Sequence, residues 1–234
     1  GTLGYGSDLI LQAMDGTIQA AVSGIADFTN YSTLTEAFQL PFLITSYDLE
    51  WQAIQTPEFQ ALLDATGEEM GLYICGVFDS GMRHIGMIDK PINTMADLSG
   101  VKLRTASSEL LLDALTTLGA SPIVVNYNEV YSALQNGVVD GEDVNYLTAV
   151  AQKHYEILGY MSEIGMYPYP SYVCFNRDAV DSLPEGYWDF MQECMNECME
   201  DYFTNIIVEA DAEAAALMEE NGVVINQISD ADAW

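Results

Sequence analysis

The apolar and polar positions along the chain alternate between short apolar runs and stretches of helical spacing. The apolar runs predict buried strands, and apolar residues three or four positions apart predict amphipathic helices. The expected strands are residues 18–24, 72–79, 82–88, 101–106, 123–126, 138–144, 173–176 and 223–228, and the expected helices are residues 7–15, 46–69 with a break near Pro57, 93–100, 107–120, 128–135 and 184–222. This alternation predicts an α/β fold, with a mainly parallel, covered sheet over residues 93–144.

Capping residues set the expected ends of several elements. Ser7 and Asn128 are expected to cap helices, and Gly16 is expected to end the first one. The run 82–88 follows 72–79 closely, so we expect it to be the partner or the continuation of that strand.

A long helix is expected to open at Pro184 and to end at Asn221–Gly222. Its expected inward stripe is Tyr187, Phe190, Met191, Cys194, Cys198, Tyr202 and Ile206. This stripe places two cysteines in the core as small buried apolar residues, which favours a packing role over a redox or metal-binding role.

The charge of the chain is strongly negative: six Lys and Arg face 36 Asp and Glu, which gives −30 at pH 7. A field of that sign repels phosphate backbones, so nucleic acid is excluded as a partner. The scattered carboxylates are typical of a solvated acidic surface. A cation-binding role is the alternative, but the sequence has no calcium-loop motif.

Motif searches find no catalytic or metal-binding set. The nucleophile-elbow, zinc-protease, phosphate-loop and dinucleotide-binding motifs are absent. Cys75 lies in an apolar strand and is expected to be structural, whereas His154 is expected to be exposed on a helix. Paired carboxylates remain an open alternative among 36 candidates. We therefore expect no enzyme, no cofactor and no metal.

Two arginines are candidates for binding an anion. Arg104 falls near the carboxyl end of the strand 101–106, the edge at which open α/β sheets bind ligands. Residues 105–108 add hydroxyl groups and the N–H groups of a helix N-terminus. Arg83 follows Gly81 at a strand junction. The alternative is that both arginines pair with internal carboxylates.

Several segments resemble one known family. The runs GMRHIGMIDKPINTMADLSGVKLRTASSE (81–109) and LGASPIVVNYNEVYSALQNGVVDGED (118–143) are similar to the central signature of the solute-binding proteins of tripartite ATP-independent periplasmic (TRAP) transporters, DctP type. Segments 3–22, 40–44, 153–162 and 183–184 match as well, in the same order and spacing.

The resemblance implies a two-lobed, periplasmic-binding-protein-like α/β fold, with a ligand cleft between the lobes and a long bracing helix. Residues 1–80 and 170–209 would form lobe I, without the family's N-terminal strand, and residues 81–169 and 210–234 would form lobe II.

The resemblance also implies a ligand site. Arg104 would hold the ligand carboxylate, Arg83 would assist, and Tyr127 would lie over the ligand. The remaining candidates are Ser107, Ser108, Asn145, Phe28, Met166 and Tyr167. The position where many acid-binding members carry Asn is Val144 here, with Asn145 next, so that contact is lost or shifted. The aromatic loop 166–172 either packs internally or makes the pocket more apolar, which favours an aromatic or branched carboxylate.

The implied function is capture of a small organic carboxylate and its delivery to the TRAP membrane permease subunits, without nucleotide. An enzyme of small carboxylates that uses the same cleft is an alternative. We expect a periplasmic or extracellular location after removal of a signal peptide, with a lipid anchor on a missing N-terminal segment as one arrangement.

Overall fold

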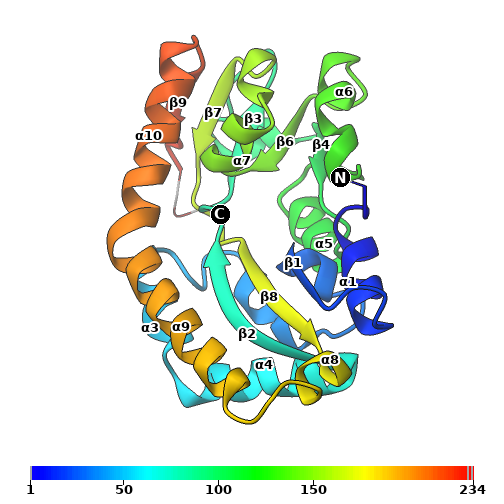
Figure 1. Ribbon diagram of the computed structural model, residues 1–234. Helices are drawn as coiled ribbons and strands as arrows, with labels where there is room; N and C mark the ends of the chain where they lie inside the picture. The colour runs from blue at the N-terminus through cyan, green and yellow to red at the C-terminus, as the bar shows by residue number, and fades with distance from the viewer. Residues whose placement is uncertain (1, 231, 233) are drawn as a thin grey trace. The chain divides into compact units, whose positions relative to one another are not determined.

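The computed structural model describes residues 2–230, 232 and 234, and the chain forms two compact units (Figure 1). The first unit comprises Gly1–Phe38, Ser46–Asp79 and Tyr169–Val208, and the second comprises Gln39–Thr45, Ser80–Pro168 and Glu209–Trp234. Residues 39–45, which the expected lobe boundaries assign to lobe I, group with the second unit. The lobe boundaries themselves stay a prediction.

The first unit has a three-stranded antiparallel sheet of order β1-β8-β2. Its strands are β1 (Ala20–Gly24), β2 (Leu72–Asp79) and β8 (Pro170–Asn176). Its helices are α1 (Ser7–Met14), α2 (Ile25–Phe28), the 3₁₀ helix η1 (Leu34–Gln39), α3 (Tyr47–Ile54), α4 (Pro57–Met70), α8 (Arg177–Asp181) and α9 (Tyr187–Asp201). Aromatic packing stabilises this core: the rings of Phe28 and Tyr172 meet edge to face, with their centroids 5.1 Å apart.

The second unit has a six-stranded mixed sheet of order β5-β4-β6-β3-β7-β9. Its strands are β3 (His84–Met87), β4 (Lys102–Thr105), β5 (Ser121–Val124), β6 (Gly141–Val144), β7 (Tyr160–Glu163) and β9 (Val224–Gln227). Its helices are η2 (Met95–Leu98), α5 (Glu109–Thr117), η3 (Tyr127–Glu129), α6 (Val130–Gln135), α7 (Tyr146–Ala151) and η4 (His154–Glu156). The helix α10 (Ile207–Glu220) packs its buried Ala214 and Met218 into this core.

Strand direction brings several polar residues to one edge of this sheet. The strand β4 runs parallel to β5 and β6, whereas β3 is antiparallel to β6. The carboxyl ends of β4, β5 and β6 therefore share an edge with the start of β3. Over residues 93–144 the strands β4, β5 and β6 are parallel to one another, as predicted, and the antiparallel β3 makes the six-stranded sheet as a whole mixed. The strands β2 and β3 lie in different sheets, so the expectation that they pair or continue one another is wrong.

The long helix buries a different face from the one predicted. In α9 and the π-helical turn η5 (Tyr202–Ile206), Met199 and Phe203 are buried, whereas Phe190 is 63% exposed. Most of the predicted stripe is exposed: Tyr187, Phe190, Cys194, Cys198 and Ile206. Packing against β2 determines which face of the helix is buried. Gly76 of β2 has no side chain, so Met195 can approach the strand closely. The backbone N–H of Val77, also in β2, donates to the Met199 sulfur at 3.1 Å.

Two predicted caps are also displaced. Ser7 is the first helical residue of α1 and the cap position is Gly6, while Asn128 lies inside η3. The helix α9 begins three residues after Pro184. None of the described helices is long and apolar enough to cross a membrane.

Candidate functional site

Arg104 of β4 is a nearly buried cation at the polar edge of the second sheet. Its side chain is 5% exposed, and its Nε donates a hydrogen bond to the carbonyl oxygen of Val125 at 3.1 Å. Within the described part of the chain Arg104 forms no ion pair. Because a buried charge is costly without a partner, this guanidinium is suited to binding an anion.

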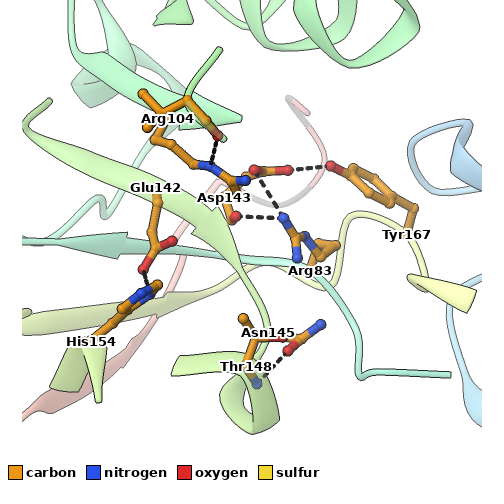
Figure 2. Close-up of polar contacts among 9 residues, drawn as sticks. Arg83, Arg104, Glu142, Asp143, Asn145, Thr148, His154 and Tyr167 are labelled. Carbon is orange, nitrogen blue, oxygen red and sulfur yellow. Dashed lines mark hydrogen bonds and ion pairs between the residues drawn. The ribbon is translucent and has the colours of Figure 1, made fainter. Parts of the chain in front are cut away.

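Arg83 already has an internal counter-ion. Its Nη2 lies 3.1 Å from a carboxylate oxygen of Asp143 and donates to the Asp143 carbonyl oxygen at 2.6 Å. The hydroxyl of Tyr167 donates to the other carboxylate oxygen of Asp143 at 2.5 Å, as Figure 2 shows. The alternative of internal pairing therefore describes Arg83, whereas it does not describe Arg104. An assisting role of Arg83 in ligand binding stays a prediction.

Tyr127 lies close to both arginines. Burial raises the pKa of its hydroxyl, while Gln152 and the positive charges of Arg104 and Arg83 act in the opposite direction. The side chain remains 39% exposed, so one aromatic surface beside the cations is accessible.

The serines and Asn145 lie at helix starts on the same edge. The Ser108 hydroxyl caps α5 by accepting from Leu111, while Ser107 is exposed. Asn145 caps α7, since its Oδ1 accepts from Thr148 N–H at 2.8 Å, and its buried Nδ2 has no hydrogen-bond partner in the described part of the chain. Asn145 therefore keeps one unused donor.

The remaining two candidates are core residues. Met166 is buried, and its backbone N–H donates to the Arg83 carbonyl oxygen at 2.9 Å. Phe28 belongs to the first unit, where it is buried against Tyr172. Eight of the nine predicted site residues thus lie in the second unit.

A buried contact between His154 and Glu142 lies on the strand next to Arg104 and was not predicted. His154 is 1% exposed, and its Nδ1 lies 2.7 Å from the carboxylate of Glu142, which is fully buried (Figure 2). The expectation of an exposed His154 is wrong, because the 3₁₀ turn η4 directs the ring inward. Glu142 and Asp143 carried no sequence signal beyond their place at the end of a strand.

His84 is a neutral histidine at the same edge. Its Nδ1 accepts hydrogen bonds from the N–H groups of Ile164 and Gly165, both at 3.1 Å. Burial lowers the pKa of His84 from 6.5 to about 4. The ring therefore serves as a fixed acceptor at neutral pH.

We expect His84 to make the chain less stable as the pH falls. The unfolded chain takes up a proton near pH 6.5, but the folded chain does so only near pH 4. The contribution of His84 is complete above pH 6.5 and is lost between pH 6.5 and 4, by up to about 1.4 kcal/mol per pH unit. Urea unfolding of the native chain and of His84→Gln at several pH values measures the difference, and parallel pH profiles would exclude this role.

Neither a metal-binding site nor a reactive thiolate is indicated among the described residues. They contain no group of three or more His, Cys, Asp or Glu that fits a metal ion. Burial raises the pKa of the Cys75 thiol to about 11.

Comparison with known sequences places the whole chain in one group. The sequence model of DctP, described as bacterial extracellular solute-binding protein, family 7, matches residues 1–233. The C4-dicarboxylate-binding periplasmic protein DctP of Vibrio cholerae serotype O1 is 27% identical over 225 residues, which covers 93% of this chain and 63% of that protein. Across curated relatives this chain spans from 49% to 70% of their length.

Comparison with solved structures gives the same fold. A TRAP periplasmic solute-binding protein from Sulfitobacter sp. NAS-14.1, with bound β-D-galacturonate, matches with a TM-score of 0.93 at 25% identity, over 100% of this chain and 77% of that one. A second, from Desulfovibrio salexigens with bound orotic acid, matches with a TM-score of 0.91 at 28% identity, over 98% of this chain and 73% of that one.

Proposed function

We propose, on the premise that this chain belongs to the DctP family of bacterial extracellular solute-binding proteins, family 7, that it captures a small organic carboxylate for a TRAP transporter. Its part is binding rather than catalysis, since the family consists of solute-binding proteins. The similar proteins named above bind a C4-dicarboxylate, a uronic acid and orotic acid, which share a carboxylate.

The observation that carries this proposal is the state of Arg104. The chain has 36 acidic residues, yet this nearly buried guanidinium lacks an ion-pair partner among the described residues. A ligand carboxylate would supply the missing charge and could accept two parallel N–H bonds. The N-terminus of α5, capped by Ser108, lies directly after β4 and adds a favourable dipole.

The other site residues would shape the ligand's surroundings. Tyr127 offers an exposed ring beside Arg104, and Asn145 offers a free amide donor. Tyr167 is engaged with Asp143, so it contributes through that contact. Met166, Tyr167 and Tyr172 of the loop 166–172 are buried and pack internally, so the exposed ring of Tyr127 is what favours an aromatic or branched carboxylate as the ligand class.

The proposal places the protein outside the cytoplasmic membrane, in keeping with a family named for extracellular binding and with a periplasmic relative. Its partners would be the ligand and the TRAP permease subunits, without nucleotide.

Thermal unfolding with paired compounds tests the proposal. Galacturonate, orotate and succinate are each compared with a neutral counterpart: galactose, uracil and butanediol. A ligand at 100 times its Kd adds about 2.7 kcal/mol to the free energy of unfolding. We expect at least one of the three acids to raise the Tm, and we expect the neutral compound paired with that acid to leave the Tm unchanged. Equal shifts with acid and neutral compound, or silence across a wide acid panel, would argue against carboxylate capture.

A further inference from the structure

We propose that His154 is a positioning residue for the ligand site: it holds the carboxylate of Glu142 and thereby leaves the guanidinium of Arg104 available to a ligand anion. This inference rests on the proposed function only in its last step, the use of Arg104 as the anchor. The contacts themselves lie within the second unit and can be tested without ligand.

The first step is the register between β4 and β6. These strands are parallel, and Arg104 lies directly opposite Glu142. Neighbouring strands are about 4.8 Å apart, and residues in register project from the same face of the sheet. Both side chains are buried. Glu142 is therefore a carboxylate that Arg104 would be expected to choose as its partner.

The second step is that the two groups do not pair. One carboxylate oxygen of Glu142 lies 2.7 Å from Nδ1 of His154. The Nε group of Arg104 donates its hydrogen bond to the carbonyl oxygen of Val125 instead. No ion pair joins Arg104 to Glu142 within the described residues. Figure 2 shows the Glu142 carboxylate directed toward His154. The contact therefore occupies the Oε1 atom of Glu142 with the imidazole rather than with the guanidinium.

The third step is that His154 is itself held in place. Its carbonyl oxygen accepts from the N–H groups of Ile157 and Leu158, both at 2.9 Å. Its ring lies 6.4 Å from the ring of Tyr131, whose hydroxyl donates to Glu156. The imidazole thus contacts Glu142 from β6 and lies near the ring of Tyr131 from α6.

The fourth step is what Glu142 would do without His154. Its second carboxylate oxygen, Oε2, is buried and has no hydrogen-bond partner among the residues that the structure describes. Loss of the histidine would leave both oxygens unpaired, with Arg104 in register on the neighbouring strand. The carboxylate would then turn to Arg104 and compete with the ligand as an internal anion.

A double-mutant cycle tests the pairing without ligand. Arg104→Gln, Glu142→Gln and their combination are made in the native background and in the His154→Leu background, and each chain is unfolded in urea. We expect the shifts in the urea midpoint to add in the native background and to depart from additivity with His154→Leu. Equal additivity in both backgrounds would overturn the proposal.

Affinity for the acid found in the ligand panel tests the consequence. We expect His154→Leu to weaken binding by about tenfold or more and the double variant with Glu142→Gln to restore it to within about threefold. His154→Asn, whose side-chain amide can take the place of Nδ1 beside Glu142, should bind like the native chain. Tyr131→Phe is the matched control, because it perturbs the same segment and leaves the histidine contact intact.

These arms separate the two proposals. A native chain that binds no acid contradicts the proposed function, while the cycle still decides whether His154 keeps the pair apart. A double variant as weak as His154→Leu itself would mean that the histidine only supports the fold, and would overturn the positioning role.

Discussion

Replacing Arg104 with alanine is expected to abolish most of the affinity for the carboxylate ligand. Truncating one partner of a buried, hydrogen-bonded charge pair costs about 2–5 kcal/mol, or roughly 30- to 4,000-fold in Kd. The large effect follows from the burial of Arg104 and from the scarcity of other cations, since the chain has only six Lys and Arg. Calorimetric titration of the native chain, Arg104→Ala and Arg104→Lys measures the loss. The lysine variant should fall in between, because it keeps the charge and loses the two-pronged geometry.

Arg177 supplies the matched control for this experiment. Like Arg104, it donates its Nε to a backbone carbonyl oxygen, that of Leu72 at 3.2 Å, but it stacks on the Tyr73 ring in the first unit. Arg177→Ala should leave Kd within about threefold of the native value. If Arg104→Ala and Arg177→Ala bound the acid equally well, Arg104 would not be the anchor.

Replacing Asp143 with alanine is expected to cause the largest loss of stability. The substitution removes the carboxylate that faces Arg83 at 3.1 Å and the acceptor of the Tyr167 hydroxyl. Breaking a buried ion pair from one side typically costs about 3–5 kcal/mol, because the remaining charge stays buried. Urea unfolding at pH 7 and low salt measures the change in the free energy of unfolding.

Two further variants separate the ion pair from the hydrogen bond. Tyr167→Phe removes only the hydroxyl and should cost about 1–3 kcal/mol, the penalty for a buried group left without its partner. Asp143→Asn keeps the shape and the backbone acceptor for Arg83, so it isolates the loss of charge. A loss below about 1 kcal/mol for Asp143→Ala would show that the pair contributes little net stability.

The sequence predicted most strands and helices because their periodicity follows from burial of one face. It also predicted the family, and the match to residues 1–233 confirms that resemblance. The failure at α9 has a physical cause. Together with η5 this helix carries two apolar rows, one with Phe190 and Cys194 and the other with Met199 and Phe203. Only packing against β2 and α3 selects the second row, and periodicity alone could not decide between them.

The positions of site residues that lie at the ends of strands could be predicted from the sequence. The place of Arg104 near the end of β4, before a capped helix, was visible in the sequence. Its lack of a partner was not, because Asp143 and Glu142 are two among 36 carboxylates. Arg83 and Asp143 are 60 residues apart, so only the pairing of β3 with β6 brings them together. His154 was misjudged because its polar neighbours in the sequence gave no hint that its ring turns inward.

The three-stretch make-up of each unit constrains how the chain can be folded during synthesis. In the first unit β1 and β2 do not pair with each other. Each pairs with β8, which comes much later in the sequence, at Pro170–Asn176. The second unit draws on residues 39–45 and also needs β9, almost 180 residues later in the sequence. A ribosome delivers residues in order, so the first sheet cannot be completed before β8 is made, nor the second before β9 is made, and the earlier strands must remain soluble until then. The acidic composition, with its charge of −30, is suited to that delay because like-charged nascent chains repel one another.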